Sequence, residues 1–248
     1  MSLPTLRVVS WSVFAGFLAL VLSVGVRGQD WRTASHEPVG LAPDPLVTTE
    51  PVVQVYAART WGWRGVFGVH TWVAVKPANA KAYTVYEVIG WRLRYSGSAL
   101  VVSERAPDAR WFGNVPELLA DKRGAGVDEL IARVERAVLE YPYADEYSVW
   151  PGPNSNTFVA WITRAVPELR VDLPPTAVGK DYLGDRLVAS APSGSGFQLS
   201  FGGLLGVTAS GVEGIEFNIL GLTFGIDPFD PAIKLPLLGR LGASKSGP

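Results

Sequence analysis

Few residues of this chain have side chains suited to acid–base or nucleophilic chemistry. The sequence contains two histidines and no cysteine, which excludes a thiol nucleophile and a cysteine-ligated metal. His70 lies in Gly-Val-His-Thr-Trp, a β-branched and aromatic run that predicts a strand. His36 lies in a proline-rich stretch and is predicted to be solvated. A strand histidine can act as a base, although a lone histidine is more often hydrogen-bonded within its sheet.

A second candidate site lies in the segment Trp-Pro-Gly-Pro-Asn-Ser-Asn-Thr-Phe, residues 150–158. Asn154, Ser155 and Asn156 fall where a helix is predicted to begin. Unpaired backbone N–H groups and the positive end of the helix dipole face such side chains, which suits a nucleophile and an oxyanion hole. Ordinary helix capping is the alternative. Capping accounts well for one of the three residues and less well for all three.

The remaining polar motifs predict no cofactor and no bound metal. Lys180 and Asp181 are expected to form a turn or a surface ion pair. Asp227 and Asp230 could offer two carboxylates to a cation, but Asp-Pro turns account for them more simply. Phosphate-binding glycine loops, zinc patterns and nucleotide fingerprints are absent from the sequence. The net charge of −1 gives no electrostatic reason to expect nucleic acid as a partner.

The pattern of apolar residues predicts an α+β fold, an antiparallel sheet with helices packed on it. Strands are expected at 52–57, 66–75, 83–95 and 100–103. Apolar residues at helical spacing predict helices at 127–141 and about 155–166. The glycine-rich segment 197–241 is expected to form short strands with tight turns. We therefore expect residues 52–242 to form a single domain.

The N-terminal residues predict a membrane anchor. Residues 8–26 are 19 residues without a charge, close to the ~20 that a helix needs to cross the hydrocarbon core. A cleaved signal peptide is the alternative, but its apolar run is usually shorter. We expect an anchor over 1–27, an irregular linker over 28–51 and a tail over 243–248. Residues 8–26 would then contact membrane lipid in a single pass, with the domain periplasmic or otherwise outside the cytoplasm.

The motifs of this chain resemble those of two families. A strand histidine followed by a helix that opens Asn-x-Asn-Thr-Phe is similar to the circularly permuted papain-like fold of lecithin:retinol acyltransferase-like and NlpC-like proteins, over residues 52–166. That resemblance implies His70 as base and Ser155 in the position of the nucleophilic cysteine. A serine nucleophile also needs a third group that orients the histidine, and Glu87 on the returning strand and Asn156 are the two candidates, between which the strand register decides. The chain also resembles an uncharacterised bacterial family of membrane-anchored proteins, through the motifs at 68–72, 150–158 and 175–182.

Two functions follow as hypotheses. In the first, an envelope protein uses a papain-like groove to bind a peptide, glycan or lipid without catalysis. Asn154, Asn156, Trp72 and Trp150 would line this groove, although the tryptophans also suit a core. In the second, a hydrolase or acyltransferase acts on an amide or ester bond, with Ser155 as nucleophile and His70 as base. A serine hydroxyl loses its proton far less readily than a thiol, which favours the first hypothesis.

Overall fold

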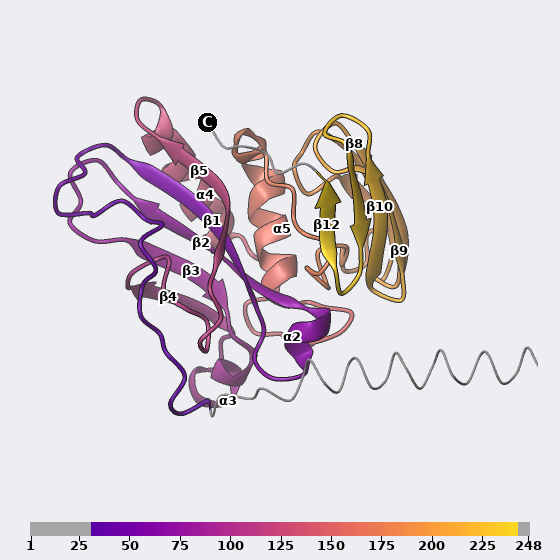
Figure 1. Ribbon diagram of the computed structural model, residues 1–248, viewed down its shortest axis with the longest axis horizontal. Helices are drawn as coiled ribbons and strands as arrows, with labels where there is room; N and C mark the ends of the chain where they lie inside the picture. Colours follow the sequence, from indigo (N-terminus) through magenta and orange to yellow (C-terminus); the bar gives the residue numbers. More distant parts are fainter. Residues whose placement is uncertain (1–30, 243–248) are drawn as a thin grey trace, which may run out of the picture.

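The computed structural model describes residues 31–242. The predicted anchor over 8–26 and the predicted tail over 243–248 lie outside these residues. Within 31–242, no helix is both long enough and apolar enough to cross a membrane. The fold is mixed helix and antiparallel sheet, with two sheets rather than the one expected (Figure 1).

The first sheet is antiparallel throughout and has the strand order β4-β3-β2-β1-β5. The strands predicted near 52–57 and 100–103 are confirmed. The sequence did not indicate β5, a charge-rich strand at the sheet edge. The strand bounds are β1 Val52–Arg59, β2 Val69–Lys76, β3 Thr84–Val88, β4 Leu100–Glu104 and β5 Glu117–Arg123.

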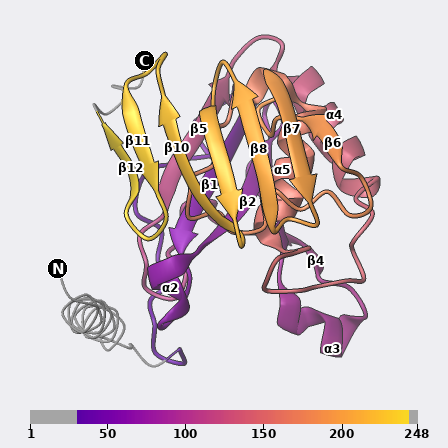
Figure 2. The ribbon, with the colours of Figure 1, turned by 90° about the vertical axis from the view of Figure 1, so that its right-hand side faces the viewer.

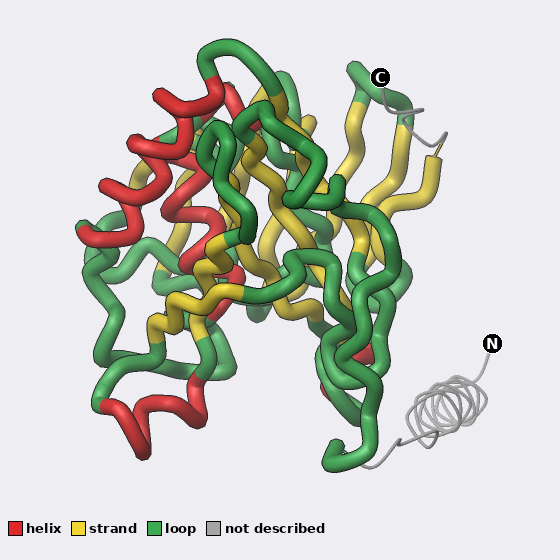
Figure 3. Tube along the Cα trace, turned by 90° about the vertical axis from the view of Figure 1, so that its left-hand side faces the viewer, coloured by secondary structure: helices red, strands yellow, loops and turns green. Residues whose placement is uncertain are grey.

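Two helices cover one face of the first sheet, as predicted. Helix α4, Val127–Leu139, and helix α5, Ser155–Ala165, bury their apolar sides against alternate residues of β1 and β2. Asn154 is the N-cap of α5, and its side chain accepts from the backbone N–H groups of Asn156 and Thr157. The opposite face of the sheet is covered by loops (Figure 3), so β1 and β2 are buried on both sides.

Two of the predicted strands have wrong bounds. Helix α2, Arg64–Phe67, occupies the start of the predicted strand 66–75. The predicted strand 83–95 ends at Val88 and continues as two helical turns, η1 Gly90–Arg92 and α3 Leu93–Ser96. A side chain at Gly90 would lie 2.4 Å from the ring of Tyr147, so a distant loop fixes where the chain leaves the sheet. The local sequence did not reveal that contact.

The second sheet is a meander of seven short strands, as the glycine-rich C-terminal segment predicted (Figure 2). A short helix, η2 Pro167–Leu169, precedes it. Leu220 and Gly221 form a two-residue turn with positive φ angles of 54° and 78°, the geometry of a tight hairpin. The strand bounds are β6 Val188–Ser190, β7 Gly196–Phe201, β8 Leu205–Ser210, β9 Gly214–Ile219, β10 Leu222–Asp227, β11 Ala232–Leu235 and β12 Gly239–Gly242.

The second sheet has its polar side chains inside and its apolar side chains outside. Its inner face lies towards α5, which is enclosed between the two sheets (Figure 1). Buried polar side chains on this face include Gln198, Thr208, Glu216 and Lys234. This arrangement reverses the usual polarity of a half-buried sheet.

Candidate functional site

His70 and Glu87 form a buried hydrogen-bonded pair on neighbouring strands of the first sheet. His70 Nε2 lies 2.8 Å from Glu87 Oε2, and Glu87 Oε1 accepts a hydrogen bond of 3.0 Å from Arg105. The His70 and Glu87 side chains are only 6% and 4% exposed, whereas that of Arg105 is 26% exposed. Of the two residues expected to orient His70, Glu87 is the one that contacts its ring.

The environment of Glu87 favours its charged form. Burial alone would raise the pKa of Glu87, but the hydrogen bonds and charges of His70 and Arg105 outweigh burial and hold that pKa below its ordinary value. Glu87 is therefore a carboxylate at neutral pH and can only accept hydrogen bonds. It follows that His70 carries a proton on Nε2.

An aromatic stack surrounds His70 and leads towards the surface. The His70 ring stacks on Trp111 with 3.8 Å between centroids, and Trp111 stacks on Trp91 at 6.0 Å. Trp72 also stacks on His70 but is fully buried, and its indole N–H donates to the backbone oxygen of Pro107. Trp72 is thus a core residue, whereas Trp91 is half-exposed.

Ser155 lies on the other side of the sheet from His70. Thr71 donates hydrogen bonds to the backbone oxygen of Ser155, at 3.1 Å, and to Asn156 Oδ1, at 3.0 Å. Thr71 therefore points towards α5. Successive side chains of a strand point to opposite faces, so His70 points away from α5. The structure does not bring Ser155 and His70 together as the papain-like resemblance implies.

The asparagines of the 150–158 motif hold three segments together. Asn156 Nδ2 donates to the backbone oxygens of Val69 and Val178, at 3.1 and 2.8 Å. Asn154 Nδ2 donates to the backbone oxygens of Val149 and Val178, at 3.2 and 3.0 Å. We call Asn154, Asn156 and their partners the asparagine clamp. Its amide hydrogens are engaged within the fold, so they do not face a ligand.

The clamp also accounts for the glycine of the 175–182 motif. Thr157 Oγ1 donates to the backbone oxygen of Gly179 at 2.7 Å. Gly179 has a φ of +98°, and a Cβ at this position would lie 2.3 Å from Asn154 Nδ2. Only glycine tolerates both that backbone conformation and that contact. The motifs at 150–158 and 175–182 are therefore parts of one packed junction.

Trp150 links this junction to the second sheet. Its side chain is 51% exposed, and its indole N–H donates to the backbone oxygen of Leu220 at 2.9 Å. The structure therefore places three of the expected groove residues, Asn154, Asn156 and Trp150, at a junction between elements, and the fourth, Trp72, in the core.

A buried charge network beneath the second sheet was not predicted from the sequence. Lys180 pairs with Glu216, and Lys234 pairs with Glu216 at 2.8 Å and with Asp172 at 2.5 Å. Lys180 and Asp181 lie in a turn, as one of the two expectations had it. The other expectation, a surface ion pair, is wrong, because the inner face of the sheet covers both residues. The signal in the sequence was the polar residues that alternate with apolar ones along the C-terminal strands.

Burial within this network changes the pKa values of its members. Burial raises the pKa of Asp181 to about 6, although Gln198 and Asn218 donate hydrogen bonds to its carboxylate. Burial alone would lower the pKa of Lys180, but the carboxylates of Glu216 and Asp181 hold it above its ordinary value. The network is satisfied internally and has the character of a structural core.

Two cavities lie near the residues described above, one beside Arg105 and one beside α5. The larger, of about 460 Å³, is on the His70 side of the first sheet, and we call it the Arg105 cleft. Its walls are prolines, Tyr83 and charged side chains from three segments, 38–45, 81–83 and 104–108. The smaller, of about 260 Å³, lies beside α5 and includes Trp161, Arg164, Tyr182 and Arg186.

A metal site is not evident in the part of the chain that the structure describes, where no group of three or more His, Asp or Glu residues could hold an ion. Asp227 accepts hydrogen bonds from the backbone N–H groups of Phe229 and Asp230, which is the geometry of an Asx turn. Asp230 pairs with Arg240 at 2.5 Å.

These features define a two-sheet α+β protein with a buried histidine–carboxylate pair and an asparagine clamp. The chain belongs to the family described as Protein of unknown function (DUF3750), which matches residues 50–182. That range includes His70, Glu87, the whole clamp and the 81–83 and 104–108 walls of the Arg105 cleft, whereas the 38–45 wall lies outside it; the range ends before the second sheet begins. Comparisons with curated proteins and with solved structures give no match.

Proposed function

We propose that this protein is a membrane-anchored protein of the bacterial envelope that binds a ligand without catalysis. The observation that carries this proposal is the position of His70 and Ser155 on opposite faces of the first sheet. A serine hydroxyl needs a base within hydrogen-bond reach to become a nucleophile. Ser155 also follows an N-cap residue whose side chain is fully used in the fold.

The Arg105 cleft is the ligand site in this proposal. It is the larger of the two cavities, it is open to solvent, and Arg105 and two of its three walls lie within the region that the family model matches. Glu87 anchors one side of the Arg105 guanidinium, so the position of its donors is fixed in the wall of the cleft. A fixed guanidinium is well suited to bind a carboxylate.

The lining of the cleft favours a peptide among the ligand classes considered. Prolines supply rigid apolar walls, and Lys81, Arg105, Asp44 and Glu104 supply charges of both signs. A lipid chain would bring apolar surface against these charges at a cost in desolvation. A glycan usually stacks on exposed aromatic rings, whereas Tyr83 of the cleft is only 2% exposed. We therefore infer a short peptide whose free carboxylate binds Arg105.

The test is peptide binding by the full chain in detergent micelles, measured by fluorescence anisotropy. The probes are fluorescein-labelled tripeptides of varied sequence, each with a free or an amidated C-terminus. We expect saturable binding that amidation or Arg105→Gln weakens about tenfold. Arg94→Ala, an exposed arginine on α3, is the matched control and should not change binding.

Two results would overturn the proposal. The first is the absence of saturable binding for every peptide in the set. The second is cleavage of a peptide by the wild-type protein but not by Ser155→Ala, which would show catalysis. Thermal unfolding of each variant separates loss of the site from loss of the fold.

The position at the membrane is also part of the proposal and is supported by the uncharged run over 8–26. Protease treatment of intact spheroplasts should digest the domain if it lies outside the cytoplasm. Complete protection until the cells are lysed would place the domain on the other side.

A further inference from the structure

The outer face of the second sheet is uniformly apolar. Within β7 to β10, every second residue points outwards, and each of these residues is Phe, Leu, Ile, Val or Ala. The intervening residues point inwards and include the buried polar network. Water therefore faces the side of the sheet that would normally form a core.

The strand register aligns these side chains into continuous rows. One row runs Phe201, Leu205, Ile219 and Leu222 across four strands. The next runs Leu199, Val207, Phe217 and Phe224. The third extends across six strands, through Phe197, Ala209, Ile215, Ile226, Ile233 and Leu241. Because no charged residue interrupts the rows, they form one surface, which we call the outer apolar face.

This face is large for a surface left in water. Phe217, near its centre, is 50% exposed, and most of its neighbours are 38–55% exposed. An aromatic side chain contributes about 200 Å², so half-exposure of roughly ten side chains of similar size gives on the order of 1,000 Å². The largest apolar patch on a typical monomer is about 300–600 Å². A standard interface buries about 800 Å² per partner, so the outer apolar face is sufficient for a stable dimer.

The residues suited to a membrane surface lie elsewhere, at one end of the molecule, which we call the aromatic end. The segments 60–68 and 89–99 lie at the same end of the first sheet because its strands are antiparallel. Trp63, Trp91 and Tyr95 are 62%, 50% and 83% exposed there, and Arg64, Arg92 and Arg94 are exposed beside them. Tryptophan, tyrosine and arginine are typical of the membrane–water interface.

The outer apolar face stands to the side of this aromatic end. Arg59, at the aromatic end, donates to the backbone oxygen of Leu237, and Trp150 donates to that of Leu220, so the aromatic end meets the turns of the second sheet. The strands of the second sheet run away from these turns, so the face of the sheet is directed to the side of the molecule and not towards the aromatic end. A bilayer against the aromatic end would therefore leave the outer apolar face directed along the membrane, towards a neighbouring protein.

We propose that the outer apolar face binds a second copy of this chain, sheet against sheet. Two such faces related by a twofold axis would meet row against row, with the sheets about 10 Å apart as in a β-sandwich. A face without charges or hydrogen-bonding side chains carries no polar group that such a contact would leave unpaired. Phe217, in the central row, would lie near the twofold axis.

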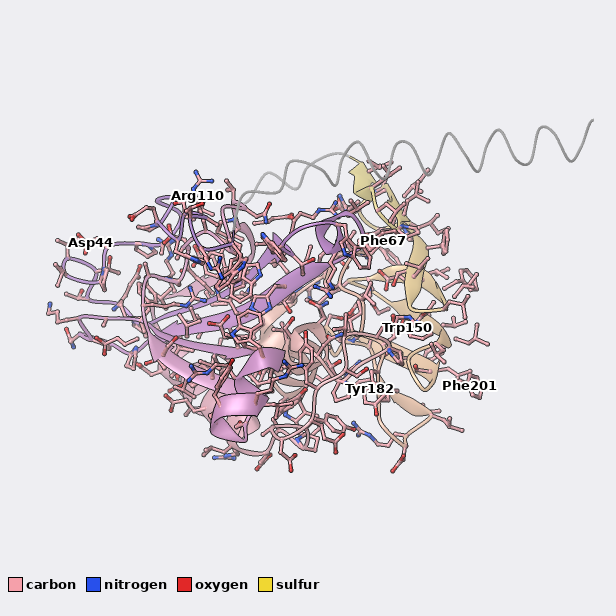
Figure 4. The ribbon with its side chains drawn as sticks, turned by 90° about the horizontal axis from the view of Figure 1, so that it is seen from below. Asp44, Phe67, Arg110, Trp150, Tyr182 and Phe201 are labelled. Carbon is pink, nitrogen blue, oxygen red and sulfur yellow. The ribbon has the colours of Figure 1, made fainter. Side chains whose placement is uncertain are left out.

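This inference is independent of the proposed ligand site. Figure 4 shows Asp44 of the Arg105 cleft and Phe201 of the outer apolar face at opposite sides of the molecule. Dimerisation and peptide binding can therefore fail separately.

The first test is the oligomeric state of the full chain in detergent micelles, measured by sedimentation with the detergent contribution subtracted. We expect a dimer, and we expect Phe217→Lys to raise the dimer dissociation constant at least about tenfold. Leu139→Lys, at a residue of α4 that is 87% exposed, is the matched control and should leave the dimer intact. A monomeric wild-type protein, or a dimer unaffected by Phe217→Lys, would contradict the inference.

A second test does not depend on how Phe217→Lys folds. Because the chain has no cysteine, one cysteine can be introduced at a time and treated with a short bifunctional crosslinker in membrane vesicles. Phe217→Cys should give a crosslinked dimer, and Leu139→Cys should not. The same variants, labelled with a fluorophore, show whether lipids that carry a quencher reach the face. Quenching at position 217 without crosslinking would assign the face to lipid, and crosslinking to a different protein would assign it to another partner; either result overturns the inference.

Discussion

Replacing Asn156 by alanine tests the role of the asparagine clamp. The Asn156 side chain donates to the backbone oxygens of Val69 and Val178 and accepts from Thr71 Oγ1, and the residue is only 3% exposed. These bonds join α5 to β2 and to the segment before Gly179. The Asn156→Ala variant loses all three, although Val178 keeps its bond from Asn154 and Thr71 keeps its bond to the backbone oxygen of Ser155.

The size of the effect follows from those three bonds. Each contributes about 1 kcal/mol net to stability. We therefore expect the free energy of unfolding to fall by about 3 kcal/mol. For a protein of this size, 1 kcal/mol shifts the melting temperature by about 2–4 °C, so the expected shift is about 6–12 °C.

The assay is thermal unfolding of the full chain in detergent micelles, followed by circular dichroism. Ser155→Ala is the matched control, because no hydrogen bond of the Ser155 hydroxyl is found in the described part of the chain, and this variant should unfold within about 0.5 kcal/mol of wild type. The reasoning is refuted if Asn156→Ala unfolds within about 2 °C of wild type. It is also refuted if Ser155→Ala is destabilised as much as Asn156→Ala.

Three further predictions concern single groups. Glu87→Gln should lower stability at neutral pH. Its difference from wild type should shrink as the pH falls from the ordinary glutamate value of 4.5 towards the lowered pKa of Glu87, where the wild-type carboxylate also gains its proton. Unfolding at a series of pH values from 7 downwards measures this, and a constant difference would contradict it. Burial raises the pKa of Asp181 from 3.8 to about 6, so the wild-type protein should lose stability as the pH rises from about 4 to about 7. A shift of roughly two units makes this loss about 3 kcal/mol larger than the loss in Asp181→Asn. Equal losses in the two proteins would count against a buried charged Asp181. Gly179→Ala should cost about 2 kcal/mol or more, whereas Gly211→Ala, where a Cβ meets nothing within 4 Å, should be nearly neutral; equal melting temperatures for the two variants would contradict the steric argument.

Helices could be predicted from the sequence where the spacing of apolar residues and the polar residues at the helix start indicate the same element. The helical spacing of Val127, Ile131, Val134 and Val138 located α4, and the polar residues before Phe158 located the start of α5. These signals arise from interactions within a few residues of the chain, so the sequence displays them directly.

The candidate site was harder to predict because it depends on which face of the sheet α5 covers. Alternation along β2 places His70 and Thr71 on opposite faces, which the sequence shows. Which of the two faces meets Ser155 is decided by packing between segments that are more than 80 residues apart. The resemblance to papain-like proteins placed His70 on that face, whereas the structure places Thr71 there.

The second sheet illustrates a different limit. Its strands were predictable from their alternation, but alternation alone does not show which side is buried. Lys180 and Lys234 are buried because Glu216 and Asp172 lie opposite them, and those contacts form only once the meander packs on the rest of the chain.

The position of Ser155 on the face of the first sheet opposite His70 predicts that its hydroxyl is not a nucleophile. The most direct test is treatment of the purified full chain with a serine-directed fluorophosphonate probe between pH 6 and 9, followed by mass spectrometry of the peptide that contains residue 155. We predict that Ser155 remains unmodified at every pH, as expected for a hydroxyl on the opposite face of the sheet from His70. Labelling of Ser155 that disappears in both Ser155→Ala and His70→Ala would contradict the account.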